Sequence, residues 1–304
     1  MKAIVIHNYG GPEVLRYEDY PDPVAKSGEV LVKVAATSIN PIDIKRRSGA
    51  MKEIFPIRFP GIVGVDVAGT VQKLGPGVNG WSVGDKVFAF ADQTYGQLCA
   101  VKAVNLAKVP DGLDLVESAA LPLVLTTGAQ LISEGTGIKE GQTVLVIGAI
   151  GSVGRAAVFA AKERGAKVVA AVRAKHMVEA KSVGADWVIS TEDNDAIAKL
   201  PAVDAVADTV AGETAQKFMG KVKSGGIFAS VLPPPGNAKE YPSVKIVSVG
   251  AHPDSELILR LGQAVKEGKL KIPISRKVPL KDAAAAHAAI EGGLAGKILL
   301  LPQM

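Results

Sequence analysis

The sequence predicts an α/β protein that combines a doubly wound parallel sheet with a separate antiparallel β domain. Its length of 304 residues suits two domains, at roughly 100–200 residues per domain. The first third alternates short strand-like runs with Gly and Pro turns, whereas the middle alternates apolar strands with helical stretches. We therefore expect one domain at residues 1–112, completed by 252–304, and a second domain at 113–251.

The N-terminal segment has the pattern of an antiparallel sheet. Turn signals such as Gly75-Pro76-Gly77 separate runs that are rich in β-branched residues. The strands are expected at 3–7, 29–37, 67–74, 86–90 and 97–101. A short helical turn is expected near residues 41–47.

The middle of the chain predicts a buried parallel sheet. Strands that are apolar throughout and joined by helical crossovers need helices on both faces of their sheet. The strands are expected at 143–147, 167–172, 186–190, 203–207, 226–231 and 245–249. The helices are expected at 117–133 with a bend at Pro122, and at 151–164, 176–183, 193–200 and 214–222.

The last fifty residues break this alternation and are expected to return to the first domain. A helix is predicted at 255–267, a strand at 272–278, an Ala-rich helix at 280–290 and a strand at 297–301.

Composition excludes several classes of protein. A net charge of +5 with no basic run longer than Lys45-Arg46-Arg47 argues against nucleic-acid binding. The single cysteine, Cys99, excludes an internal disulfide and a cysteine-based zinc site. No apolar run approaches the length of a membrane span, and the N-terminus lacks a signal-peptide pattern, so we expect a cytoplasmic protein with no membrane partner.

A glycine-rich turn follows the first parallel strand. Gly148, Gly151 and Gly154 stand between an apolar strand and a helix, with Ser152 and Val153 between the last two glycines. Glycine permits a tight turn and lets a pyrophosphate approach the backbone, while the helix N-terminus supplies N–H donors. The motif predicts dinucleotide binding rather than a purely structural turn.

The end of the second parallel strand indicates which dinucleotide is bound. An NAD site usually has a carboxylate there for the ribose 2′-hydroxyl. This chain has Arg173 and Lys175 and no acid between residues 168 and 175. Arg173 and Lys175 could simply be solvated charges at the start of a loop. The absence of an acidic residue nevertheless favours NADPH as the cofactor.

Several segments together resemble the medium-chain dehydrogenase/reductase superfamily, in its zinc-free quinone oxidoreductase and alkenal-enone reductase branch. They are SINPIDIK (38–45), PGIVGVDVAGTV (60–71), VGDKVF (83–88), the glycine turn, VDAVADTVAGET (203–214) and GKILL (296–300). The resemblance implies a GroES-like catalytic domain, a Rossmann domain that binds NADP(H), and an active site in the cleft between them.

The zinc alcohol dehydrogenases of this superfamily use Cys, His and Cys as metal ligands. Motif matching puts Asn40, Val65 and Leu123 at those places, and none of the three is a competent zinc ligand. The four histidines (His7, His176, His252 and His287) are scattered. We therefore predict no metal. Without a Lewis acid, the expected reaction is hydride transfer from NADPH to a small electrophile, either an α,β-unsaturated carbonyl or a quinone.

The resemblance implies roles for particular residues. Asn40 and Lys45 are the catalytic candidates: Asn40 would orient the nicotinamide or the substrate carbonyl, and Lys45 would stabilise the enolate oxygen or relay a proton. Alternatively, Lys45 is a solvated residue paired with Asp43 or Glu53, and Asp43 caps the short helix. Cofactor contacts are implied for Thr126 or Thr127, Gly151, Ser152, Val153, Val231, Leu232 and Lys297.

Two further expectations follow from the same resemblance. A homodimer is expected to form along the strand at 245–249, and residues 232–236 are expected to form either a stiff wall of the substrate pocket or a rigid connector. The functional alternative is a non-catalytic NADPH-binding protein, either crystallin-like or a sensor. It would bind NADPH without turning over any acceptor.

Overall fold

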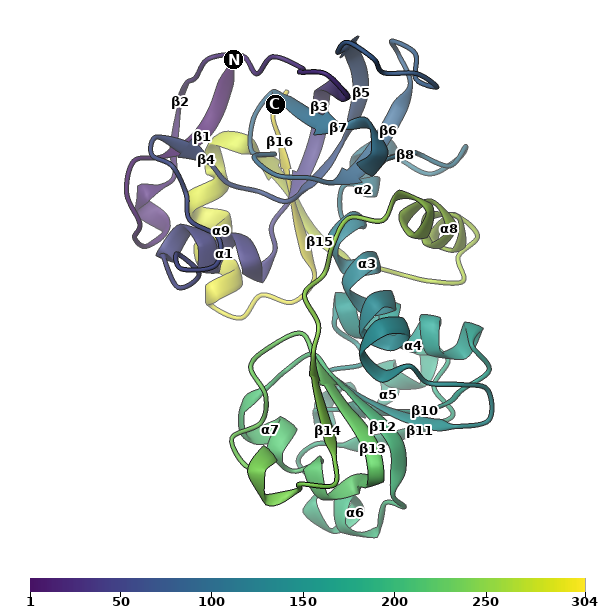
Figure 1. The fold of residues 1–304 in the computed structure, drawn as a ribbon. Coiled ribbons are helices and arrows are strands. Elements are labelled where there is room, and N and C mark those ends of the chain that lie inside the picture. Colours follow the sequence, from purple (N-terminus) through teal and green to yellow (C-terminus); the bar gives the residue numbers. More distant parts are fainter. Residues whose placement is uncertain (304) are drawn as a thin grey trace. The chain divides into compact units, whose positions relative to one another are not determined.

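The computed structural model describes residues 1–303, which divide into two compact units (Figure 1). The first unit contains Met1–Leu123 and the segment from Pro253 onward, and the second contains Val124–His252. The expected boundary at 112/113 therefore lies earlier than the boundary in the structure. Helix α2 (Leu115–Ser118) explains the difference, because it packs on strands β3, β5 and β6 of the first unit.

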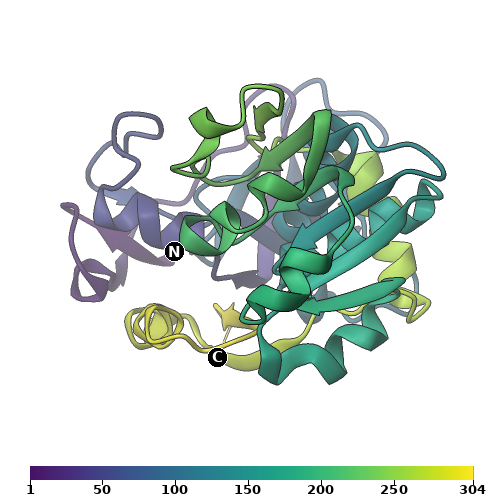
Figure 2. The same ribbon diagram turned by 90° about the horizontal axis from the view of Figure 1, so that it is seen from below.

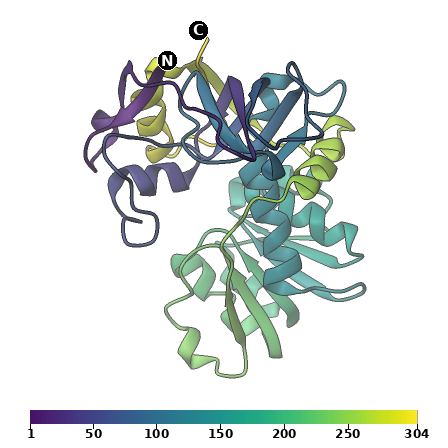
Figure 3. The ribbon, with the colours of Figure 1, turned by 45° about the horizontal axis from the view of Figure 1, so that its top comes forward.

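The main sheet of the first unit has the order β15-β16-β3-β5-β6-β8, with β7 paired to β3. Its strands are β3 (Glu29–Ser38), β5 (Asp66–Leu74), β6 (Lys86–Phe90), β7 (Leu98–Lys102), β8 (Leu106–Lys108), β15 (Ile274–Pro279) and β16 (Lys297–Leu301). The C-terminal strand β16 runs antiparallel to β3, with Leu300 opposite Thr37. Figure 3 shows this yellow strand among the purple and blue strands of the N-terminal segment.

A smaller sheet of the first unit has the order β2-β1-β4. It contains β1 (Lys2–Ile6), β2 (Arg16–Asp19) and β4 (Gly61–Ile62). The apolar core beside it joins β1 to the C-terminal helix α9 (Ala283–Glu291), since Ile4, Ile6 and Ala283 are all buried in one cluster. The first unit also holds helices α1 (Pro41–Ser48) and α8 (Ser255–Lys266).

The second unit contains a six-stranded parallel sheet of order β11-β10-β9-β12-β13-β14. Its strands are β9 (Thr143–Ile147), β10 (Lys167–Val172), β11 (Trp187–Ser190), β12 (Val203–Asp208), β13 (Val222–Ser230) and β14 (Lys245–Ser248). The winding direction reverses between β9 and β12, and ligands of such sheets bind outside the carboxyl ends of the strands at that point. The predicted α/β doubly wound sheet and the antiparallel β domain are thus confirmed.

Helices cover both faces of the parallel sheet (Figure 2). They are α3 (Pro122–Gln130), continued by a π-helical turn at Leu131–Thr136, α4 (Ser152–Glu163), α5 (Met177–Ala180), α6 (Asn194–Lys199) and α7 (Gly212–Gln216). Leu145 of β9 packs in one cluster with Ile197 of α6 and Ala215 of α7. Because side chains alternate along a strand, Val144 and Val146 face the other side, where α4 contacts β9 and β10.

The structure corrects two expected helices and adds strands that were not expected. The helix predicted at 117–133 is divided into α2 and α3, because Pro122 cannot continue the preceding turn. The helix predicted at 214–222 ends at Gln216, and Val222 already begins β13. Strands β2, β4 and β8 were not predicted. No helix within residues 1–303 combines the length and apolar character that a membrane crossing requires.

Candidate functional site

The glycine turn between β9 and α4 leaves room for backbone only. Gly148 has φ +79°, which a residue with a side chain rarely adopts. A Cβ atom on Gly154 would lie 2.1 Å from the carbonyl oxygen of Gly148 and 2.8 Å from Cα of Ala149. Both contacts are with backbone atoms that cannot move aside. The third glycine is therefore required for α4 to pack against the turn.

Helix α4 begins at this turn with donors that are not capped. Its N-cap residue is Gly151, which has no side chain to accept from the first backbone N–H groups. The amides of Ser152 and Val153 belong to the helix turn whose N–H groups have no partner inside the helix. Together with the helix dipole, these amides can bind an anion such as a pyrophosphate.

Arg155 of α4 stabilises the glycine turn through its side chain. Its Nε donates to the carbonyl oxygen of Ile150 at 2.8 Å, and its guanidinium forms an ion pair with Glu179. The side chain is largely buried. Since both polar ends of Arg155 have protein partners, it shapes the turn rather than adding a charge toward a phosphate.

The loop after β12 lies against the same turn. The buried carboxylate of Asp208 accepts from the N–H groups of Val210 and Ala211 at 2.9 and 3.0 Å, and from the hydroxyl of Ser230 at 2.8 Å. It holds Ala211 at φ +63°, ψ −166°, a conformation found almost only for glycine. Gly148 has no room for a Cβ because Thr209 and Val210 of this loop would contact it.

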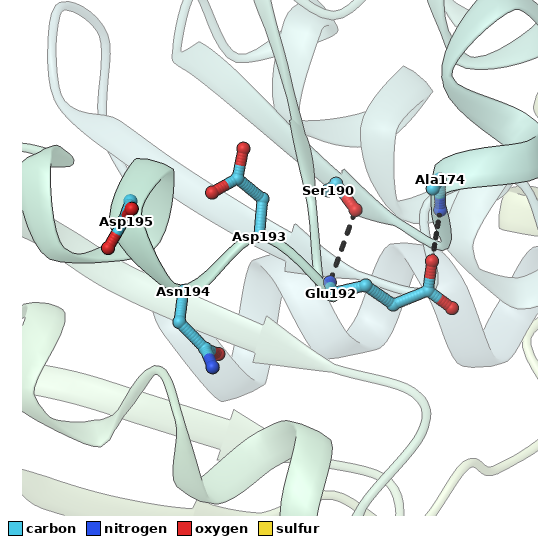
Figure 4. A pocket seen from close by; sticks show the side chains of 6 residues that line it. All are labelled: Ala174, Ser190, Glu192, Asp193, Asn194 and Asp195. Carbon is cyan, nitrogen blue, oxygen red and sulfur yellow. Dashed lines mark hydrogen bonds between the residues drawn. The ribbon is translucent and has the colours of Figure 1, made fainter.

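The predicted 2′-phosphate residues directly follow β10. Arg173 and Lys175 are exposed, and within residues 1–303 neither side chain has a hydrogen bond or an ion pair. Two unpaired cations beside the carboxyl edge of the sheet suit a phosphate ligand. Figure 4 shows that a carboxylate of the neighbouring loop, Glu192, also reaches this loop.

The remaining cofactor candidates of the second unit lie on two elements. Val231 and Leu232 directly follow β13 and are half-buried at the carboxyl edge of the sheet. Thr126 and Thr127 lie in α3, where both side chains are buried. The structure therefore brings Gly148, Arg173 and Val231 to one edge, because each follows a parallel strand.

In the first unit, Asn40 belongs to a buried polar cluster with Asp66 and Lys297. Asn40 Nδ2 donates to Asp66 Oδ2 at 2.8 Å, and Lys297 Nζ donates to Asn40 Oδ1 at 2.5 Å. Asn40 is 1% exposed and Lys297 is 4% exposed. Both ends of the Asn40 amide therefore have a protein partner.

Lys297 has three acceptors around its ammonium group. Besides Asn40, these are the carbonyl oxygen of Ile39 at 3.3 Å and Asp66 Oδ2 at 3.4 Å. Burial lowers the pKa of Lys297, and the Asp66 carboxylate acts in the opposite direction. The resemblance implied a cofactor contact for Lys297, but in this arrangement its donors already bind protein oxygens.

Lys45 differs from its two basic neighbours. Arg46 forms a two-bond pair with Asp92, and the buried Arg47 binds Glu291 of α9. The half-buried Lys45 side chain has no hydrogen bond or ion pair within the described part of the chain, so the alternative pairing with Asp43 or Glu53 is not present. Its ammonium group is available to a ligand.

Asp43 caps α1, as expected, by accepting from the N–H of Asn40 at 2.8 Å. Its Oδ2 also accepts from the hydroxyl of Tyr95 at 3.2 Å, and that hydroxyl lies 3.1 Å from His287 Nε2. Burial raises the pKa of Asp43 to about 7 and lowers the pKa of His287 to about 3. Near neutral pH, His287 is therefore neutral and Asp43 is close to half protonated.

One carboxylate bonds to two of the three positions, Asn40 and Leu123, that motif matching assigns to the zinc ligands of related dehydrogenases. Asp66, next to Val65, binds Asn40 through Oδ2 and accepts from the backbone N–H of Leu123 through Oδ1 at 2.7 Å. Across residues 1–303, no group of three His, Cys, Asp or Glu side chains could hold a metal ion. The donor set at this position does not fit a zinc ion.

Sequence reasoning missed Asp66, Arg155, Glu192 and Asp208 as contributors to the two sites. Asp66 and Asp208 stand inside the quoted motifs, and their isolation among apolar residues was the available signal. A charged residue in an apolar run is buried only when it has partners.

Known proteins resemble this chain along its whole length. The family model of the alcohol dehydrogenase GroES-like domain matches residues 26–114, and the zinc-binding dehydrogenase model matches 183–300. A chloroplast envelope quinone oxidoreductase homolog of Arabidopsis thaliana is 34% identical, over 99% of this chain and 98% of its own.

Two further comparisons bear on the cofactor. An NADPH-dependent alkenal/one oxidoreductase of Arabidopsis thaliana chloroplasts is 31% identical, over 99% of this chain and 80% of its own. The structure of Escherichia coli quinone oxidoreductase in complex with NADPH is 27% identical, matches 99% of this chain and 100% of its own, and has a TM-score of 0.87.

Proposed function

Because this chain belongs to the medium-chain dehydrogenase/reductase superfamily, we propose that it is an NADPH-dependent oxidoreductase that reduces quinones or α,β-unsaturated carbonyls. The observation that carries the proposal is the turn at Gly148–Gly154, whose uncapped amides and missing side chains fit a pyrophosphate. Relatives of this chain that are named for quinone and enone reduction support the substrate class.

The second unit would hold the cofactor along the carboxyl edge of its sheet. The amides of Ser152 and Val153 bind the pyrophosphate, and Arg173 and Lys175 bind the 2′-phosphate. Val231 and Leu232 contact the nicotinamide half, with Thr126 or Thr127 as a further contact. When bound, NADPH supplies the hydride.

The first unit would supply the group that stabilises charge on the substrate. Conjugate reduction of an enone places hydride on the β-carbon and negative charge on the carbonyl oxygen. Lys45 is proposed as the cation for that oxygen, because its ammonium group has no protein partner. Asn40 and Lys297 are proposed as positioning residues, since their polar atoms are bonded to each other and to Asp66.

The reaction is proposed to need no zinc. A carboxylate with bonds to Asn40 and to the Leu123 amide lies where related dehydrogenases place their ligands. We further propose a cytoplasmic homodimer that pairs along β14, which is the edge strand of the parallel sheet. Light scattering tests the dimer, and a monomer would contradict it.

The function is tested by NADPH consumption with metal-stripped protein. A simple enone, a simple quinone and a saturated aldehyde are compared, and each is repeated with NADH. The proposal predicts saturable turnover of the enone or the quinone with NADPH and none of the aldehyde. Tight NADPH binding with no turnover of any acceptor would instead favour a non-catalytic NADPH-binding protein.

A further inference from the structure

One acidic side chain reaches the loop that is proposed to bind the 2′-phosphate. Glu192 follows β11, and its Oε2 accepts from the backbone N–H of Ala174 at 2.9 Å (Figure 4). Ala174 stands between Arg173 and Lys175. The backbone N–H between the two cationic residues therefore already donates to a carboxylate.

The fold places Glu192 there through strand register. Val172, the last residue of β10, pairs with Ser190, the last residue of β11. The residues that follow these two strands consequently lie side by side. The hydroxyl of Ser190 accepts from the backbone N–H of Glu192 at 3.1 Å and fixes the start of this loop.

The carboxylate binds the amide and leaves the cations unpaired. Arg173 and Lys175 make no ion pair with Glu192 or with any other residue among 1–303. Glu192 also lines an open pocket of ≈ 590 Å³ together with Asp193, Asn194 and Asp195. The loop that carries the two unpaired cations therefore adjoins a pocket lined by three acidic residues.

We propose that Glu192 is a specificity-determining residue that competes with the 2′-phosphate for the Ala174 amide and thereby limits the preference for NADPH over NADH. This inference rests on the proposed function. A phosphate held by Arg173 and Lys175 would approach the carboxylate closely, and two like charges about 4 Å apart repel even near a protein surface. NADH has a hydroxyl at that position and does not meet this repulsion.

Binding is measured by calorimetry with the full chain, using 2′,5′-ADP and 5′-AMP as probes and NADPH and NADH as cofactors. Glu192→Gln keeps the length of the side chain and an acceptor for the Ala174 amide but removes the charge. We expect it to bind 2′,5′-ADP and NADPH about tenfold more tightly. Binding of 5′-AMP and NADH is expected to stay within about twofold.

Asp195→Asn is the matched control, because Asp195 lines the same pocket and does not contact Ala174. It is expected to leave all four affinities unchanged. The gain from Glu192→Gln should also shrink in 1 M salt, where the screening length is about 3 Å. A thermal shift with 2′,5′-ADP gives a second readout that is independent of activity.

Three results would overturn the inference. Unchanged affinity of Glu192→Gln for 2′,5′-ADP would show that the carboxylate does not compete. Weaker NADH binding with unchanged NADPH binding would make Glu192 an acceptor for the ribose hydroxyl instead. An equal gain in affinity for 2′,5′-ADP from Asp195→Asn would show that the effect comes from the net negative charge of the pocket and not from the contact of Glu192 with Ala174. If neither the wild type nor the variant binds 2′,5′-ADP or NADPH, the proposed function fails as well.

Discussion

The carboxylate of Asp66 fixes the side-chain amide of Asn40, with Asn40 Nδ2 lying 2.8 Å from Asp66 Oδ2. The same carboxylate accepts from the Ser38 hydroxyl at 2.5 Å and from the Leu123 amide at 2.7 Å. Asp66 is 0% exposed, so these bonds replace water entirely. The orientation of Asn40 therefore depends on a charge that the protein has buried and paired with Lys297.

Asp66→Asn is predicted to cost about 3–5 kcal/mol of unfolding free energy, because it leaves the Lys297 ammonium buried without a counter-charge. The double variant Asp66→Asn/Lys297→Met is predicted to cost less than the sum of the two single variants. Urea denaturation of the four proteins measures this coupling. Additive losses would show that the two charges do not stabilise each other.

Lys45→Met is predicted to lower kcat/KM for the enone by about 100–1000-fold, the scale of losing one group that stabilises an oxyanion. The melting temperature should not change, since the Lys45 side chain has no protein partner among residues 1–303. Lys52→Met is the control, because Lys52 is an exposed lysine just beyond the same helix. Equal kinetic losses in both variants would remove Lys45 from the reaction.

Two glycines of the turn should respond differently to the addition of one methyl group. Gly154→Ala is predicted to destabilise the protein by about 3 kcal/mol, because its Cβ would overlap the Gly148 carbonyl oxygen. Gly151 has φ −66°, and its Cβ would lie 3.3 Å from that oxygen. Gly151→Ala should therefore destabilise the protein much less than Gly154→Ala. It should lose NADPH affinity, because the added methyl group stands at the N-cap beside the amides proposed to bind the pyrophosphate. Thermal unfolding and calorimetry separate the two effects, and equal stability of both variants would contradict the prediction.

Asp43 and His287 should influence stability with opposite dependence on pH. The pKa of Asp43 is raised by burial from 3.8 to about 7, so its contribution decreases as pH rises through that window. The pKa of His287 is lowered by burial from 6.5 to about 3, so its contribution is lost as pH falls below 6.5. Between about pH 4 and 6.5 the two slopes cancel.

Single variants should separate the contributions of Asp43 and His287 to the pH dependence of the free energy of unfolding. Asp43→Asn is predicted to give stability that rises by about 1.4 kcal/mol per pH unit relative to the wild type, and His287→Gln to give a fall of similar size. Urea denaturation between pH 4 and 6.5 measures both. Profiles parallel to that of the wild type would show that these groups keep their ordinary pKa values in the fold.

The parallel sheet was predictable because its strands are apolar throughout. The limits of its strands β9 and β10 match the prediction residue for residue, as do those of β16 in the first unit. β2 (Arg16–Asp19) was missed because its sequence, RYED, is charged and it forms the edge of a small sheet. The prediction began β13 at Gly226 and assigned residues 214–222 to a helix, although Val222 already pairs with Val203.

The sequence motifs of both sites could be recognised, but the residues that form hydrogen bonds with them could not be predicted. Asp66 lies 26 residues from Asn40 and 231 from Lys297 along the chain, so no local pattern links them. Glu192 reaches Ala174 only because β10 and β11 are paired in one particular register. These contacts depend on tertiary structure, which hydrophobic periodicity does not specify.

Hydride transfer to the β-carbon of an activated acceptor can be followed by isotope labelling. NADPH that carries deuterium at the reactive position of the nicotinamide is used to reduce a simple enone, and the product is examined by NMR. Conjugate reduction should give deuterium at the β-carbon, a proton from water at the α-carbon, and an intact carbonyl group. Deuterium at the carbonyl carbon of an allylic alcohol would contradict it and would indicate carbonyl reduction instead.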